Sequence, residues 1–180
     1  MIIRIAKWLG LTLAATLLLS AFAYASMRIH DGPVKFFPWF TISIGGPFRS
    51  GEAAPSPPDW EFIADREEID IQTILPSTSR TVWVPVIDGK LYIVSGYMNS
   101  SIGRLWKQWP SYMAQDNRVR IRIDGKIYDQ RLERITEGPI TAAVMSEVVR
   151  KYANGPDTIN PAAGAAVSSG SVWLFEVVDL

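Results

Sequence analysis

One uncharged apolar segment near the start of the chain constrains the fold more than any other feature. Residues Trp8–Ala25 are apolar apart from Thr12, Thr16 and Ser20, and they carry no charge. A helix of about 18 or more apolar residues is long enough to cross a bilayer. We therefore expect an N-terminal hydrophobic helix, with the remaining residues folding as a separate body in water.

Two interpretations of this segment are open. A cleaved signal peptide has a basic start, here Arg4 and Lys7, and a small-residue exit such as Ala23-Tyr24-Ala25. An uncleaved single-pass anchor is favoured by the length of the apolar run and by the aromatic side chains beyond it, which are typical of a membrane interface. These aromatic residues are Phe36, Phe37, Trp39 and Phe40.

Both interpretations predict the same side of the membrane for the body of the protein. The basic residues before the apolar run should remain in the cytoplasm. In a bacterium the anchor reading gives a protein of the inner membrane with its body in the periplasm. The signal-peptide reading gives a protein secreted to the periplasm after cleavage.

Charge and composition exclude several classes of function. Lys+Arg and Asp+Glu are equal at 18 each, which argues against a nucleic-acid partner bound through bulk positive charge. The chain has no cysteine, so disulfides, thiolate metal sites and thiol catalysis are excluded. The one histidine, His30, adjoins the apolar segment, and we expect no metal site and no Ser-His triad.

The pattern divides the chain into three parts. Residues 1–27 form the anchor or signal segment, residues 28–58 form a Gly- and Pro-rich juxtamembrane linker, and residues 59–180 form the folded domain. Alternating apolar residues and β-branched runs predict strands in this domain. These strands are expected at residues 69–74, 80–87, 90–95, 118–123, 126–135 and 171–178.

Turn and helix signals complete the predicted fold. Two Asp-Gly pairs, at residues 88–89 and 124–125, predict tight hairpins. Helices are expected at residues 102–115 and from Pro139 to the stop signal at residues 154–156, followed by a mobile loop over residues 157–170. We therefore predict an α+β fold that is mainly β with two helices, closed into a small barrel without exposed edges.

Three clusters offer positive charge to an anion, and each also has an ordinary structural interpretation. Hydroxyls beside Arg80 at residues 76–81 suit a phosphate or a solvated turn. The small-residue loop from Ser95 leads into a helix whose first turn holds Arg104 and Lys107, which suits an anion or an ordinary surface helix. The arginines at 118, 120 and 122 form a solvated strand face or face anionic lipid.

Several stretches in order along the chain carry a family resemblance. They are Thr78-Ser79-Arg80-Thr81 with the strand to Val86, the Asp88-Gly89 turn with its strand to Ser95, the stretch Trp106–Trp109, and Asn117–Ile121. Together they resemble the split-barrel flavin-binding superfamily, which is pyridoxamine-phosphate-oxidase-like. The resemblance is closest to its deazaflavin-dependent nitroreductase-like branch, and it covers about residues 69 to 135.

The resemblance implies a small six-stranded split β-barrel, a homodimer, and FMN or a deazaflavin as cofactor. Ser79, Arg80 and Thr81 would lie on the strand that faces the cofactor. Ser95 and Gly96 would pass beside its ring, Arg104 and Lys107 would meet its phosphate, and Trp109 would border the pocket.

Two functions from different classes follow from the sequence. The first is a membrane-tethered oxidoreductase that depends on FMN or a deazaflavin, with the cofactor carrying out the hydride chemistry. The alternative is a non-enzymatic envelope binding module for an anionic ligand, a lipid or a protein partner. A purely structural envelope domain is expected if neither Arg80 nor Lys107 matters.

Overall fold

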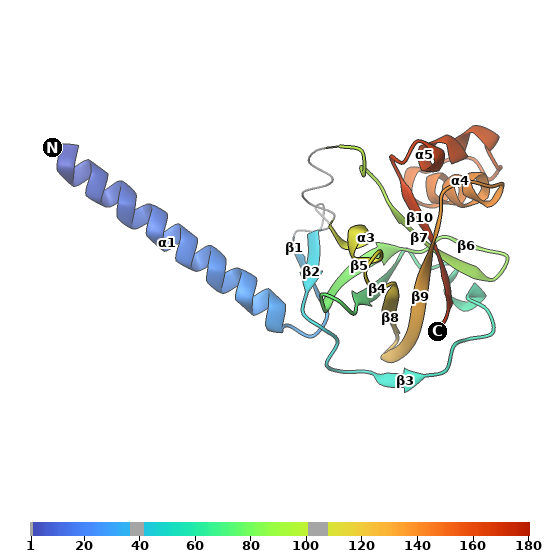
Figure 1. The fold of residues 1–180 in the computed structure, drawn as a ribbon, viewed down its shortest axis with the longest axis horizontal. Helices are drawn as coiled ribbons and strands as arrows, with labels where there is room; N and C mark the ends of the chain where they lie inside the picture. The colour runs from blue at the N-terminus through green and yellow to red at the C-terminus, as the bar shows by residue number, and fades with distance from the viewer. Residues whose placement is uncertain (1, 37–41, 101–107) are drawn as a thin grey trace.

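The computed structural model describes residues 2–36, 42–100 and 108–180, which form a long N-terminal helix and a β-rich body (Figure 1). Helix α1 spans Ile2–Ile29 and projects away from the body. Only its last turn, residues 26–28, is partly buried against the body. Within it, Arg4–Ile29 is long and apolar enough to be a membrane anchor or a signal sequence, as the sequence predicts.

Within the described residues, the body is a curled sheet of ten strands. Their bounds are β1 Pro33–Phe36, β2 Ile42–Gly45, β3 Glu52–Ala54, β4 Glu68–Thr73, β5 Thr78–Trp83, β6 Val86–Ile87, β7 Lys90–Ser95, β8 Arg118–Ile123, β9 Lys126–Ile135 and β10 Trp173–Asp179. The order in the sheet is β1-β2-β5-β4-β8-β9-β10-β7-β6. All neighbours in this order are antiparallel, and β3 pairs with β9 in parallel.

A bend between two consecutive strands forces the sheet to curl into a split half-barrel. Strand β6 follows β5 after only two residues, Val84 and Pro85. In the order of the sheet, however, the two strands are separated by β4, β8, β9, β10 and β7. The chain can join them only if β7 comes round to approach β5. The bend is held by side chains from the end of helix α4, because the Tyr152 hydroxyl accepts the N–H of Val84 at 2.8 Å and Lys151 donates to the Val84 carbonyl at 2.9 Å.

Both Asp-Gly turns form the predicted hairpins. Asp88 and Gly89 have φ values of 50° and 75°, and Asp124 and Gly125 have values of 50° and 77°. Two successive positive φ values belong to the tight turn whose twist matches that of antiparallel strands. These turns connect β6 to β7 and β8 to β9, so this part of the prediction is confirmed.

The apolar core lies inside the curl. Directly paired residues of antiparallel strands share one face of a sheet. Ile71 pairs with Ile121, and Ile121 pairs with Tyr128, so these three side chains form one interior row across β4, β8 and β9. All three are buried, with Ile71 and Ile121 fully inaccessible to solvent.

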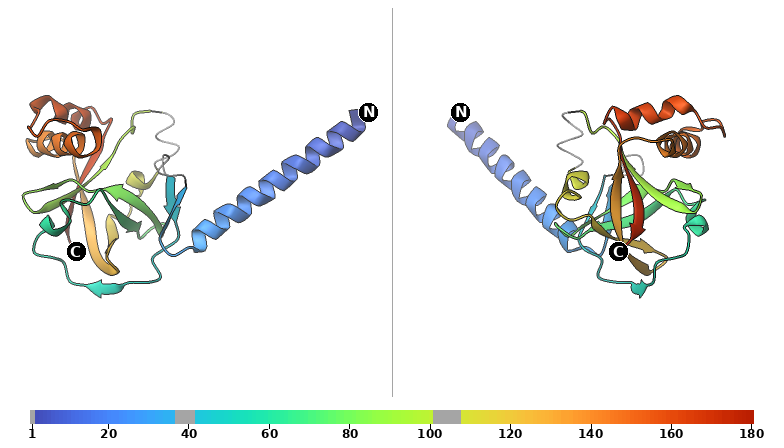
Figure 2. Two further views of the ribbon diagram at one scale, coloured as in Figure 1. Left: turned by 180° about the vertical axis from the view of Figure 1, so that it is seen from behind. Right: turned by 45° about the vertical axis from the view of Figure 1, so that its right-hand side comes forward.

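Short helices cover the open parts of the half-barrel. They are the 3-10 helix η1 Glu61–Ile63, helix α3 Trp109–Tyr112, helix α4 Ile140–Ala153, the 3-10 helix η2 Pro161–Gly164 and helix α5 Ala165–Ser168. Helix α4 ends at Asn154 in the left-handed conformation, as its stop signal predicts. Figure 2 shows α4 and α5 together on the side of the body away from the C-terminal end of α1.

The prediction of a mainly β fold with helices behind an apolar helix is confirmed, but its element counts are too low. In the described residues the structure has ten strands instead of six, and it has helices α3, α4 and α5 beyond α1 instead of two. Residues 102–107 of the expected helix 102–115 lie outside the described residues. Residues 28–58, expected to be a linker, contain β1, β2 and β3. The expected mobile loop over residues 157–170 contains η2 and α5, because Val167 is buried in the core.

The interior row predicts a large difference between two isoleucine substitutions. Ile121→Ala should lower the free energy of unfolding by about 2–5 kcal/mol, because it leaves a cavity in the core. Ile159→Ala, at a side chain that is 65% exposed, should change it by less than about 0.5 kcal/mol. Urea unfolding of the full chain in a nonionic detergent, followed by tryptophan fluorescence, measures both. Equal losses would contradict the assignment of the core.

Candidate functional site

Arg80 on β5 is a charged residue inside the half-barrel. It pairs with Ile71 of β4, which belongs to the interior row with Ile121. The Arg80 side chain therefore shares the core face of the sheet. Ser79 and Thr81, its neighbours along β5, lie on the opposite face, because successive side chains of a strand alternate.

The guanidinium of Arg80 is incompletely paired. One terminal nitrogen donates to the Thr78 hydroxyl at 2.9 Å, and the group lies 5.4 Å from the centre of the Trp109 ring. Its Nε is buried and has no hydrogen-bond partner among the described residues. Among the ion pairs of those residues, none joins Arg80 to a carboxylate.

The electrostatic surroundings of Arg80 are unfavourable for its charge. Desolvation by burial, together with the positive charge of Arg28, lowers the pKa of Arg80 to about 10, while Tyr112 acts in the opposite direction. The guanidinium is still charged at neutral pH. A charge that is buried without a counter-ion costs free energy, and such groups concentrate at functional sites.

The second cation, Arg28, lies at the end of α1 and fixes that end against the body. Its guanidinium donates to the Gly45 carbonyl at 3.3 Å and to the Ser77 carbonyl at 3.1 Å. The chain approaches closely here, since a Cβ on Gly46 would lie 2.3 Å from the Arg28 carbonyl oxygen. We call this contact, formed by Arg28 with Gly45 and Ser77, the helix clamp.

The other residues that the sequence predicts for a cofactor site lie in different places. Ser79 donates its hydroxyl to the Gly46 carbonyl at 2.6 Å, and Thr81 donates to Asp70 at 3.0 Å, both on the outer face. Ser95 is buried and donates to the sulfur of Met98 at 3.5 Å.

The remaining residues predicted for the cofactor site are Gly96, Arg104, Lys107 and Trp109. Gly96 has open space where a side chain would begin, with no atom within 4 Å. Trp109 is buried in the core, 5.7 Å from the ring of Phe175. Arg104 and Lys107 lie outside the described residues. Of the predicted set, Arg80 and Trp109 are therefore the pair that the structure brings together.

These positions allow a test of fit for the implied cofactor. The unpaired Nε of Arg80 suits an anionic group, such as the phosphate of FMN or of a deazaflavin. The hydroxyls of Ser79 and Thr81 do not fit the same group, because they face away from Arg80 and already have protein acceptors. The described residues thus fit an anion at Arg80 without the full set of contacts that the resemblance implies.

The three arginines of β8 are all paired with carboxylates. Arg118 pairs with Asp116 at 2.7 Å, and Arg120 pairs with Asp129 at 3.1 Å. Arg122 pairs with both Asp31 and Asp70 and lies 4.3 Å from the ring centre of Phe48. This arrangement favours the interpretation of a structural, solvated face over a lipid-binding face.

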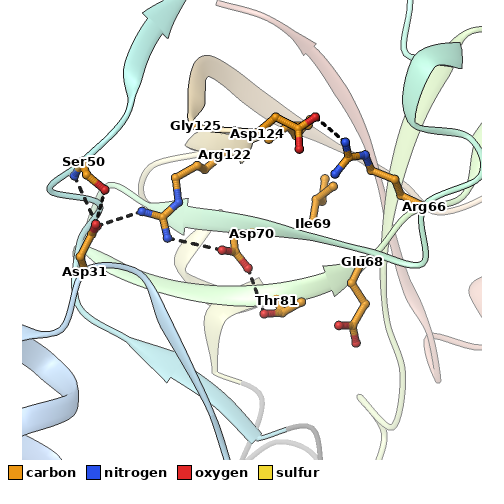
Figure 3. Close-up of a pocket in the computed structure, with 11 residues that line it drawn as sticks. Asp31, Ser50, Arg66, Glu68, Ile69, Asp70, Thr81, Arg122, Asp124 and Gly125 are labelled. Atoms are coloured by element: carbon orange, nitrogen blue, oxygen red, sulfur yellow. Dashed lines mark hydrogen bonds and ion pairs between the residues drawn. The ribbon is translucent and has the colours of Figure 1, made fainter.

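A polar pocket of about 490 Å³ surrounds the Arg122 network on the outer face (Figure 3). Figure 3 shows Arg122 between Asp31 and Asp70, with Arg66 directed at Asp124. Desolvation raises the pKa of Asp31, but hydrogen bonds from the Arg49 N–H and the Ser50 hydroxyl, with the charge of Arg122, lower it to about 2. Four acidic side chains and only two arginines line this pocket, and both arginines are already paired within it. The lining therefore does not suit an anion, and we interpret the pocket as a structural network.

Sequence reasoning missed Arg28 and the partners of Arg122. No local signal identifies the role of Arg28, because its carbonyl partners Gly45 and Ser77 lie 17 and 49 residues away in the sequence. The partnership of Asp31 with Arg122 joins residues 91 positions apart, and no local pattern predicts it.

Two comparisons with known proteins found no match for this chain. No protein-family model matches the chain. No curated protein matches it significantly.

The contrast between Arg80 and Arg122 predicts opposite effects of the same substitution. Arg80→Met should leave the free energy of unfolding unchanged or raise it by about 1 kcal/mol, because it removes a buried charge that lacks a counter-ion. Arg122→Met should lower it by about 2–4 kcal/mol, because Asp31 and Asp70 lose their partner. Urea unfolding of the two variants tests this. A loss for Arg80→Met as large as that for Arg122→Met would show that Arg80 is structural.

Proposed function

We propose that this chain is a membrane-tethered split-barrel protein that binds an anionic ligand beside Arg80. The observation that carries the proposal is the buried Nε of Arg80, which has no hydrogen-bond partner among the described residues. In this proposal α1 remains as a single-pass anchor and the half-barrel is the binding body. The body lies on the extracytoplasmic side, because Arg4 and Lys7 stay in the cytoplasm.

An unsatisfied buried donor such as the Arg80 Nε–H is costly, and a ligand anion would satisfy it. Leaving a buried polar group without a partner costs about 1–3 kcal/mol, and more when the group is charged. A ligand phosphate or carboxylate would accept the free Nε–H and neutralise the charge at the same time. The core already supplies the burial that strengthens such a bond, since Trp109 covers one side of the guanidinium.

A second candidate is the narrower proposal of an FMN- or deazaflavin-dependent oxidoreductase. It is favoured by the proximity of Arg80 and Trp109, two residues that the resemblance assigns to the cofactor site. Here Arg80 would hold the cofactor phosphate, and the cofactor would supply the hydride chemistry. A homodimer belongs to this second candidate, because the resemblance implies it.

Binding to Arg80 is tested by calorimetry on the full chain in a nonionic detergent. FMN, a deazaflavin and glycerol 1-phosphate are titrated separately, and we expect at least one of them to bind. Arg80→Gln should weaken that binding about 10–100-fold, because a hydrogen bond to a charged group contributes about 1.5–3 kcal/mol.

Arg120→Gln is the matched control, because Arg120 lies on the outer face and is paired with Asp129. It should bind like the parent. Binding of FMN or the deazaflavin, but not of glycerol 1-phosphate, would favour the oxidoreductase candidate. Absence of binding by all three ligands, or equal binding by Arg80→Gln and the parent, would contradict the proposed function.

A further inference from the structure

We infer that the ligand of Arg80 is the phosphate headgroup of an anionic phospholipid, which enters the half-barrel from the bilayer that holds α1. This inference rests on the proposed function and names the ligand of the same site. It follows from where the helix clamp places Arg80 relative to the end of the apolar helix.

The length of α1 puts Arg28 at the level of the lipid headgroups. The candidate span Arg4–Ile29 has 26 residues and would be about 39 Å long as a helix, against about 30 Å for the hydrocarbon core. The uncharged run ends at Ala25, and Arg28 lies about 4.5 Å further along the axis. A cation at that position belongs in the headgroup layer.

The helix clamp then brings one end of the half-barrel to the same level. Arg28 binds the carbonyl of Ser77, which lies in the turn between β4 and β5. Leu75 in this turn is 58% exposed, as an apolar side chain resting on a membrane interface would be. The turn that carries Ser77 and Leu75 therefore lies beside the end of α1 that is placed at the headgroup layer.

Arg80 directs its guanidinium toward this end. Its terminal nitrogen reaches back along β5 to the hydroxyl of Thr78, the first residue of the strand and the neighbour of Ser77. Arg28 and Arg80 thus approach the start of β5 from two sides, and their mutual repulsion contributes to the lowered pKa of Arg80. Neither cation has a carboxylate partner among the ion pairs of the described residues.

The two cations at headgroup level have no carboxylate partner among the described residues, and their positive charge is complementary in sign to a lipid phosphate. Each basic residue near an anionic membrane surface contributes about 1 kcal/mol of attraction. A lipid phosphate seated beside Arg80 would accept the Nε–H that has no partner among the described residues, and its single negative charge would offset one of the two positive charges. The three arginines of β8 offer no comparable site, because each has an acidic partner.

The test is the thermal unfolding of the full chain in nonionic micelles that contain either phosphatidylglycerol or phosphatidylcholine at equal mole fraction. A ligand that binds only the folded state raises the unfolding midpoint. Phosphatidylglycerol should raise it by about 3–6 °C relative to phosphatidylcholine. Arg80→Gln should lose most of this rise, and Arg120→Gln should keep it.

A third arm separates the lipid from a free anion. Glycerol 1-phosphate added to micelles of neutral detergent should raise the midpoint less than phosphatidylglycerol does at the same concentration. An equal, Arg80-dependent rise with the free phosphate would overturn the lipid inference and leave the proposed function intact. Equal midpoints in the two lipids, or a full rise in Arg80→Gln, would also overturn the inference.

A measurement on the parent chain covers the case in which Arg80→Gln does not fold. Hydrogen exchange is compared in phosphatidylglycerol and phosphatidylcholine micelles. Added protection of residues 74–83 and 108–113 by the anionic lipid supports the inference. Protection elsewhere, or none, contradicts it.

Discussion

The position of the body relative to its anchor depends on one guanidinium, that of Arg28. It binds carbonyl groups from two segments that are far apart in the sequence, Gly45 at the end of β2 and Ser77 before β5. Because β2 and β5 are also paired with each other, this contact joins α1 to the sheet rather than to a loose linker. The orientation of Arg80 toward the anchor follows from this geometry.

The curled sheet explains why an arginine lies on the interior face of the half-barrel. Strand β5 must present one face to the interior, and its register places Arg80 there together with the buried Ile71. Natural cores avoid a charge without a counter-ion, because an apolar side chain of similar volume is at least as stable. Departures of this kind are expected where function requires them. The paired Arg122 on the outer face shows how the same residue type is placed when it serves stability.

Sequence reasoning predicted the parts of this structure that depend on local signals. The two Asp-Gly turns and the left-handed stop at Asn154 are encoded within a few residues, and each forms as expected. Strands β2 and β3 were missed because they depend on distant partners. Gly45 pairs with Ser79, and residues Glu52–Ala54 pair in parallel with β9.

Only part of the candidate site was predicted from the sequence, because the rest depends on contacts between residues that are distant along the chain. The cluster around Arg80 was visible in the sequence, but the period of two along β5 separates Ser79 and Thr81 from Arg80. Trp109 joins Arg80 only through the fold, and the role of Arg28 appears only when α1 meets the turn at Ser77.

The central claim, that the turn before β5 rests at the membrane surface, is tested most directly by measuring its depth. The chain has no cysteine, so Leu75→Cys provides a single site for a fluorophore. Ile159→Cys is the matched control, since its side chain is 65% exposed and that of Leu75 is 58% exposed. In bilayers whose lipids carry a spin label on the headgroup, the account predicts strong quenching at position 75 and little at position 159. Equal, weak quenching at both positions would contradict it.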